Sequence, residues 1–305
     1  MRVVSLLPSA TEIVFGLGAG DELVGRSPEC DYPPEARDVP VVSRNLIDPA
    51  VLSSHEIDRA VASHLGDGGS LYHVDEAALQ AARPDVILTQ ALCEVCAASL
   101  NDVKAVASKL DHRPEIVSLD PRNLHEVFEA IVRVGERLGR RSEAEAFAAG
   151  LSRRVEEVRR RTAPLDDRPR TFCVEWVDPI FNAGHWVPQM VEFAGGHDDL
   201  ARTGEPSVAL PWSDVVRYAP EVLVVMPCGF DADRAAKEAE ILTALPGWRD
   251  LPAVRHDRVF AVDGSSYFSR PGPRLADGVE ILASILHPKR FGHHWSKADV
   301  RPVAV

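Results

Sequence analysis

Four of the five cysteines in this chain fall in segments that are predicted to be loops. Cys93 and Cys96 form a C-x-x-C pair, while Cys30 and Cys228 each follow a short apolar run. Thiolates are soft ligands that suit zinc, iron–sulfur clusters or copper(I). A lone C-x-x-C pair also occurs in redox motifs and in tight turns without any chemical role. We therefore predict a metal site of Cys30, Cys93, Cys96 and Cys228, with small turn residues as the alternative. The fifth, Cys173, lies in a strand-like run and is predicted to be an inert core thiol.

A second group of side chains suits a large planar ligand. Trp176, Trp186 and Tyr267 offer flat apolar surface, with ordinary core packing as the alternative. The imidazole of His185 could serve as an axial ligand to a metal centre, or it could simply decorate the surface. Arg270 follows a serine in a proline-rich segment that cannot be helical, which indicates recognition of a carboxylate, amide or phosphate unless it forms a salt bridge.

Short apolar runs alternate with amphipathic stretches, which is typical of parallel sheets covered by helices. Residues 3–7 are predicted to form the first strand, and Ser9 with Glu12 forms a capping-box pattern at the following helix. Residues 83–88 (RPDVIL) are echoed by residues 219–224 (APEVLV), so we predict two related Rossmann-like lobes. Ligands of such sheets bind outside the carboxyl ends of the strands. The predicted ligand-binding residues in these loops are Ser9, Asp31, Glu94, Trp176, His185, Trp186, Tyr267 and Arg270.

The middle of the chain has helical periodicity and little strand signal. Apolar residues at helical spacing between 142 and 161 form one stripe, which predicts a single long helix that joins the lobes. The predicted α/β organisation is a first lobe at 1–120, connecting helices at 121–165, a second lobe at 166–288 and a polar tail at 289–305.

Composition excludes several classes of function. The formal net charge of -12 argues against nucleic acid or an anionic membrane as a partner. No apolar stretch is long enough to span a bilayer, and no pattern at the start resembles a signal peptide. We therefore expect a cytoplasmic location for the sequence as given, or a periplasmic or extracellular one if a leader was removed. A nucleophile elbow, a phosphate-binding glycine loop and a dinucleotide fingerprint are all missing, so we do not expect an enzyme.

The run from Val3 to Glu12 (VVSLLPSATE), the central helix and the two proline–acid–strand repeats resemble the periplasmic-binding-protein family for cobalamin and ferric siderophores. The resemblance covers nearly the whole chain. The cobalamin-binding branch of that family is similar in residues 93–96 (CEVC), 227–230 (PCGF) and 269–274 (SRPGPR), and the chain resembles a leaderless member of it.

The resemblance implies two lobes joined by one long helix, with the ligand held in the cleft between them. It also implies docking to an ABC permease through one acidic residue on each lobe, for which Glu76 and Asp214 are the candidates. We expect a non-catalytic solute-binding protein for cobalamin or another metal chelate. The alternative is a cytoplasmic metalloprotein, a cofactor chaperone or sensor, whose rim cysteines hold zinc or an iron–sulfur cluster.

Overall fold

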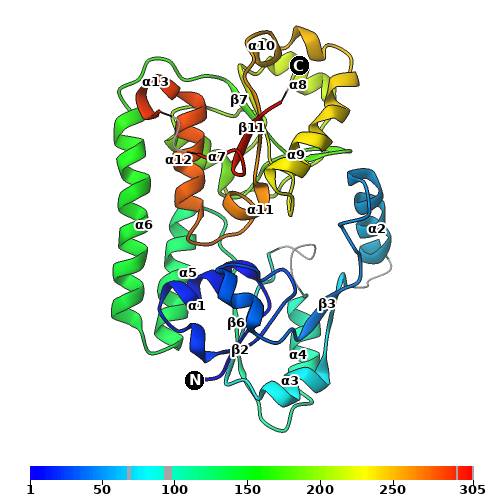
Figure 1. Ribbon diagram of the computed structural model, residues 1–305, viewed down its shortest axis with the longest axis vertical. Helices are drawn as coiled ribbons and strands as arrows, with labels where there is room; N and C mark the ends of the chain where they lie inside the picture. Colours follow the sequence, from blue (N-terminus) through cyan, green and yellow to red (C-terminus); the bar gives the residue numbers. More distant parts are fainter. Residues whose placement is uncertain (67–69, 93–97, 293–294, 304–305) are drawn as a thin grey trace. The chain divides into compact units, whose positions relative to one another are not determined.

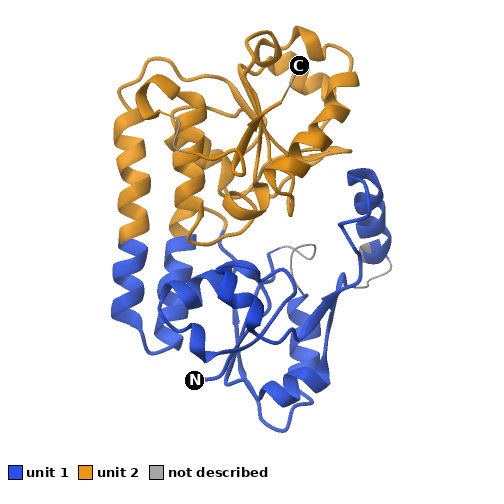
Figure 2. Cartoon of the chain, in the orientation of Figure 1, with its two compact units in different colours: residues 1–121, 127–149 blue, residues 122–126, 150–305 orange. Residues whose placement is uncertain are grey.

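The computed structural model describes residues 1–66, 70–92, 98–292 and 295–303 (Figure 1). The chain forms two compact units (Figure 2). Unit 1 contains residues 1–121 and 127–149, and unit 2 contains residues 122–126 and 150–305. The predicted fold class, two α/β lobes and a long helix, is confirmed. None of the helices in the described ranges is long and apolar enough to cross a membrane.

Unit 1 is built on a parallel sheet with the strand order β2-β1-β5-β6. These strands are β1 (Val3–Ser5), β2 (Leu23–Arg26), β5 (Val86–Thr89) and β6 (Glu115–Ser118). A separate antiparallel pair joins β3 (Ser43–Asn45) to β4 (Tyr72–Val74). The helices of this unit are α1 (Pro8–Gly16), α2 (Ser54–Gly66), α3 (Glu76–Ala82) and α4 (Leu100–Ala107). The two central strands, β1 and β5, are buried along their whole length because both faces of a parallel sheet are covered.

Unit 2 is built on a five-stranded sheet with the order β11-β10-β9-β7-β8. Its strands are β7 (Thr171–Val177), β8 (Ile180–Asn182), β9 (Val222–Val225), β10 (Val259–Val262) and β11 (Val300–Pro302). Only β7, β9 and β10 are parallel, since both edge strands pair antiparallel. Its helices are α7 (Val187–Phe193), α8 (Trp212–Tyr218), α9 (Ala232–Ala239), α10 (Pro252–Arg255), α11 (Gly264–Tyr267), α12 (Leu275–Leu286) and α13 (Pro288–Phe291).

The sheet of unit 2 differs from the prediction in two ways. The prediction of a parallel sheet holds for the three central strands only. Residues 289–305 were expected to be a polar tail, but Val300 to Pro302 form β11 on the edge of the sheet, and Val300 is fully buried. A three-residue edge strand is too short for hydrophobic periodicity to reveal it.

Two consecutive helices, α5 (Leu124–Arg137) and α6 (Arg141–Thr162), contribute residues to both units. The 22 residues of α6 make a rod of about 33 Å, in agreement with the predicted long helix. Its buried stripe contains Leu151, Val155 and Val158. Within unit 2, Arg154 of α6 binds Asp277 and Glu280 of α12 at N···O distances of 2.5 and 2.7 Å, which fixes the second half of the helix.

The start of α1 does not use the predicted capping box. The helix begins at Pro8, its N-cap is Leu7, and no side chain caps it. Proline is well suited to the first position, where its missing N–H would have no partner. Ser9 and Glu12 are both buried instead, at 1% and 4% exposure.

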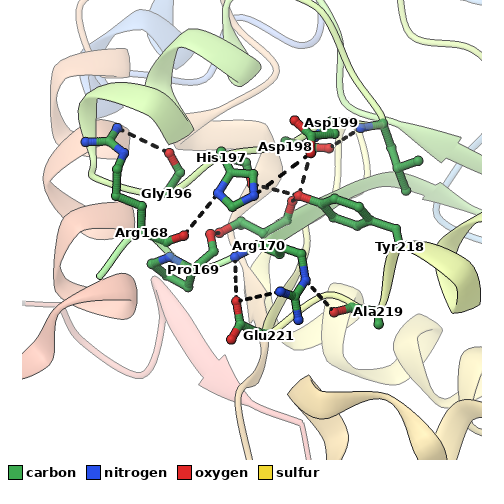
Figure 3. A network of polar contacts seen from close by, with 12 residues as sticks. Arg168, Pro169, Arg170, Gly196, His197, Asp198, Asp199, Tyr218, Ala219 and Glu221 are labelled. Carbon is green, nitrogen blue, oxygen red and sulfur yellow. Dashed lines mark hydrogen bonds and ion pairs between the residues drawn. The ribbon is translucent and has the colours of Figure 1, made fainter. Parts of the chain in front are cut away.

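The predicted sequence repeat is a structural repeat. In unit 1 the backbone N–H and carbonyl of Arg2 bind the Asp85 side chain and N–H, both at 2.7 Å. In unit 2 the same groups of Arg170 bind the Glu221 side chain and N–H at 3.0 and 2.7 Å (Figure 3). Each arginine Nε also donates to a carbonyl at the C-terminal end of a helix, that of Ala82 at the end of α3 and that of Ala219 directly after α8. These two corners, at Arg2–Asp85 and Arg170–Glu221, confirm that the lobes are related.

The helices that lead into the two corners end in the same way. Both α3 and α8 have seven residues, and each is followed by a non-glycine residue in the left-handed conformation. These residues are Arg83, with φ of 44°, and Ala219, with φ of 51°. Each then precedes a proline, which cannot continue a helix.

Candidate ligand-binding site

The loops that follow the three parallel strands of unit 2 are joined by backbone hydrogen bonds. Cys228 N–H donates to the carbonyl of Glu175 at the end of β7, at 3.2 Å. Ser265 N–H donates to the carbonyl of Phe230 at 3.1 Å. The carboxyl ends of β7, β9 and β10 therefore form one continuous surface, made of residues 175–178, 226–230 and 263–274. We call this surface the carboxyl-end rim of unit 2.

Gly264 allows two of these loops to approach closely. A Cβ added at this position would lie 2.6 Å from the carbonyl oxygen of Pro227 and 2.7 Å from that of Met226. Both neighbours are backbone atoms, which cannot rotate away as a side chain would. The contact between the loops after β9 and β10 therefore depends on glycine.

Aromatic rings line the part of the rim that follows β7. Trp176 is partly buried, and its ring centroid lies 5.3 Å from that of Phe230. The guanidinium of Arg234 lies over the Phe230 ring, at 3.7 Å from its centroid. An open cavity of about 280 Å³ lies beside the tip of the β7–β8 turn. Its lining residues are Val177, Asp178, Ile180, Leu210, Trp212, Ile241 and Leu245.

Trp186 connects the rim to the segment that follows β8. Its Nε1 donates to the carbonyl of Phe268 at 2.7 Å, and its side chain is among the buried ones at 5% exposure. The predicted ligand-facing indole is thus mainly a structural anchor. The anchor holds residues 183–186, which we call the His185 loop, against the loop that follows α11.

His185 has an unusual backbone conformation, and its ring nitrogens have no hydrogen-bond partner among the described residues. Its φ is 52°, in the left-handed region, and its N–H and carbonyl bind Glu205 and Gly204 at 2.6 and 2.9 Å. The imidazole is half-buried, and no hydrogen bond joins its nitrogens to any other residue that the structure describes. Burial, and to a smaller degree the charge of Arg122, lowers the pKa of His185 below its usual value. A neutral imidazole with a free lone pair is a potential metal ligand.

Tyr267 and Arg270 lie together on the loop after β10. The Tyr267 hydroxyl donates to Asp299 at 2.8 Å, and burial followed by this carboxylate raises the pKa of the tyrosine. Arg270 donates to Ser265 Oγ at 3.1 Å, and both residues are partly exposed. The structure thus brings the predicted residues Trp176, Tyr267, Arg270 and Cys228 onto one rim.

The corresponding loops of unit 1 are also joined to one another. Ser27 N–H donates to the Ser5 carbonyl at 2.9 Å, which connects the segments after β1 and β2. Cys30 is fully buried there, with its Sγ 3.2 Å from Ser27 Oγ and 3.8 Å from the Ser5 carbonyl oxygen. The Cys30 thiol thus lies within hydrogen-bonding distance of both segments. Ser9 is buried at 1% exposure, and Asp31 is partly exposed.

The predicted four-cysteine metal site remains a prediction. Cys93, Glu94 and Cys96 lie outside the described residues. Among the residues that are described, no three histidine, cysteine, aspartate or glutamate side chains gather in a way that could hold a metal ion. Cys173 is a core thiol whose pKa is raised by burial, in agreement with the interpretation from the sequence.

Sequence reasoning missed one charged residue of the site, Glu175. The pairing of β7 with β8 shifts by one residue between Val174 and Trp176, so Glu175 occupies a β-bulge. Its carboxylate accepts hydrogen bonds from Ser207 Oγ at 2.7 Å and from Gly184 N–H at 3.4 Å. Burial raises its pKa. The only available signal was a single acidic residue within the apolar run of residues 171–177.

Comparison with known proteins gives one family match. The family model described as "Periplasmic binding protein" matches residues 3–265. The chain is 25% identical over 297 residues to an uncharacterized ABC transporter substrate-binding lipoprotein, YvrC, of Bacillus subtilis, a match that covers 95% of this chain and 81% of the relative. It is 24% identical over 289 residues to a vitamin B12-binding protein of Vibrio cholerae, covering 93% and 88%.

Solved structures share the fold. A periplasmic heme binding protein from Pseudomonas aeruginosa aligns with a TM-score of 0.72 at 19% identity, covering 100% of this chain and 98% of that chain. At this level of identity the likeness concerns the fold alone.

Proposed function

Because the chain belongs to the periplasmic binding protein family and is therefore a solute-binding protein rather than an enzyme, we propose that its solute is a metal-containing macrocycle. Cobalamin is the first candidate, since curated relatives that match over most of the chain are named vitamin B12-binding proteins. The macrocycle binds against the carboxyl-end rim of unit 2 and the His185 loop. The zinc or iron–sulfur alternative is not favoured by the family match.

The observation that carries this proposal is the His185 imidazole, which has no hydrogen-bond partner among the described residues. A half-buried histidine normally satisfies at least one ring nitrogen with a neighbour. Here the ring is held 5.5 Å from that of the anchored Trp186, with both nitrogens available. A free imidazole nitrogen beside aromatic surface suits the axial coordination of a macrocyclic metal.

Arg270 supplies the second element of recognition. Its guanidinium lies on the rim near Ser265, where it presents fixed N–H donors to polar groups at the edge of a macrocycle. Trp176, partly exposed on the same rim, offers flat apolar surface for the face of the ring system. Affinity then comes mainly from aromatic burial, and orientation comes from a few polar contacts.

The test is a visible-absorbance titration with aquocobalamin, with hemin as a parallel ligand. Wild-type protein should change the cobalamin spectrum, and His185→Ala should weaken binding at least about tenfold, as expected for the loss of a metal–ligand bond. His256→Ala is the matched control, because His256 is exposed and precedes β10 at its amino end. No spectral change and no thermal shift with cobalamin would refute cobalamin as the solute. Binding of hemin alone would reassign the macrocycle.

We further propose that Glu76 and Asp214 dock the protein to an ABC permease. Each lies in the first turn of one of the two equivalent seven-residue helices, α3 and α8. Glu76 is exposed and Asp214 is partly exposed, and each forms an ion pair with a surface cation, Lys109 at 2.9 Å and Arg217 at 3.2 Å. Such exposed pairs are weak and are easily exchanged for arginines of a partner.

Charge reversal tests the docking residues. The variant Glu76→Lys with Asp214→Lys should lose stimulation of the ATPase of a cognate permease in proteoliposomes, while its affinity for the macrocycle stays unchanged. Normal stimulation by this double variant would contradict the docking proposal and leave the ligand proposal intact.

A further inference from the structure

We infer that Glu175 is a positioning residue, whose carboxylate holds the His185 loop in the conformation that presents the imidazole to a ligand. The inference rests on the proposed function and extends it to a residue that does not itself touch the ligand. It depends on a bulge, a hydrogen-bond triangle and a close backbone approach, all within unit 2.

The bulge determines where the carboxylate points. Val174 pairs with Asn182 and Trp176 pairs with Phe181, so Glu175 is the extra residue of β7. A bulge re-aims a side chain that a regular strand would send elsewhere, and bulges are frequent beside functional sites. In this position the side chain of Glu175 reaches Gly184, in the segment that follows β8, and Ser207.

Three groups then form a hydrogen-bond triangle. The Ser207 hydroxyl donates to Glu175 Oε1 at 2.7 Å. Gly184 N–H is shared between Ser207 Oγ at 3.1 Å and Glu175 Oε2 at 3.4 Å. The carboxylate thereby connects the strand β7 to two segments that are more than twenty residues apart in the sequence.

The triangle brings the His185 loop against residues 204–207. A Cβ on Gly184 would lie 2.6 Å from the Pro206 carbonyl carbon, so the two backbones are in direct contact. The neighbouring His185 is then held through its own N–H and carbonyl by Glu205 and Gly204. A left-handed conformation is unfavourable for a residue with a Cβ, so it persists where surrounding contacts impose it.

Asn182 secures the same segment from the other side. Its Nδ2 donates to the Leu200 carbonyl at 2.6 Å, and its Oδ1 accepts from Val208 N–H at 2.7 Å. Residues 200–208 are therefore fixed at both ends, and Glu175 controls the part that contacts the His185 loop. A carboxylate in an apolar strand is costly to desolvate. In return, the Glu175 oxygens accept the hydrogen bonds from Ser207 and from Gly184 N–H.

The experiment compares Glu175→Ala, Glu175→Gln and Ser207→Ala with a control, Glu192→Ala, an exposed carboxylate on α7. The first readout is the Cε1–H cross-peak of His185 in ¹H–¹³C NMR spectra of the ligand-free protein, assigned by its loss in His185→Ala. The second is the affinity for aquocobalamin. We expect Glu175→Ala to shift or broaden the His185 peak and to weaken cobalamin binding at least tenfold. Glu175→Gln, which keeps an acceptor for Gly184 N–H, should restore both readouts, and Glu192→Ala should alter neither.

The outcomes separate this inference from the proposed function. An unchanged His185 peak in folded Glu175→Ala would overturn the positioning role. Should that variant fail to fold, Ser207→Ala decides the question, because it removes both the hydrogen bond that orients the Glu175 carboxylate and one acceptor of Gly184 N–H. An unchanged His185 peak in Ser207→Ala would then overturn the positioning role. If the wild-type protein binds no cobalamin, the proposed function fails while the NMR readout still tests the positioning role.

Discussion

Asp198 should make the stability of unit 2 depend on pH, and Asp198→Asn should remove that dependence. The carboxylate accepts hydrogen bonds from Leu200 N–H at 3.0 Å and from Cys173 N–H at 3.4 Å. Burial outweighs both bonds and raises the pKa of Asp198 to about 7, with a smaller contribution from the charge of Asp199. The group therefore stays protonated in the folded state at pH values where an exposed aspartate is ionised.

The stability of the folded state should fall as the pH rises, because the folded and unfolded states release the Asp198 proton at different pH values. Because the folded-state pKa is raised, the unfolded chain releases the proton first as the pH rises above about 4, and the folded state loses stability until it also ionises near pH 7. Each pH unit in this window corresponds to about 1.4 kcal/mol, so the loss between pH 5 and pH 8 is about 2.7 kcal/mol. Above pH 8 the contribution is constant.

Urea denaturation followed by tryptophan fluorescence measures this effect in unit 2 specifically, because all the tryptophans of the chain belong to that unit. They are Trp176, Trp186, Trp212, Trp248 and Trp295. The informative quantity is the difference in unfolding free energy between wild type and Asp198→Asn at pH 5, 6, 7 and 8, since other titrating groups cancel. Glu192→Gln, at an exposed carboxylate on α7 that does not contribute to the pKa of Asp198, is the control. A difference that stays constant across this range would refute the reasoning.

Three substitutions test the packing of unit 2 by thermal and urea denaturation. Gly264→Ala places a Cβ against the Pro227 carbonyl and should lower the unfolding free energy by roughly 2 kcal/mol; a neutral effect would mean that the loops separate easily. Ala219→Gly removes the strain of a Cβ in the left-handed conformation and should raise the unfolding free energy by about 0.5 kcal/mol. A lower unfolding free energy would show that the greater entropy of the unfolded chain dominates. Trp186→Phe removes the bond to the Phe268 carbonyl and should cost about 1 kcal/mol, and no cost would contradict its role as an anchor.

The repeat and the long helix could be predicted because they depend on local patterns. Apolar spacing marked α6 to within a residue at each end, and the proline–acid signal marked the strands β5 and β9. Both features are dictated by neighbours in the sequence. The capping box at Ser9 was wrong because Pro8 can begin the helix by itself, which left the serine free to be buried.

The parts that could not be predicted depend on contacts between distant residues. The bulge at Glu175 exists only in relation to its partner strand, and the bond between Glu175 and Ser207 spans 32 positions. The edge strand β11 is a strand because β10 offers it hydrogen bonds. The sequence predicted Trp186 as a ligand contact, and only tertiary packing shows that its indole is an anchor.

The corners at Arg2–Asp85 and Arg170–Glu221 give the molecule an internal comparison. A nearly identical set of hydrogen bonds joins the starts of two neighbouring strands in both lobes, once in a purely parallel sheet and once in a mixed sheet. Replacing Asp85 in one variant and Glu221 in another therefore removes an equivalent hydrogen bond from each of the two sheets. A difference between the two changes in unfolding free energy would show how much the surrounding sheet, rather than the hydrogen bond itself, determines the contribution of a corner to stability.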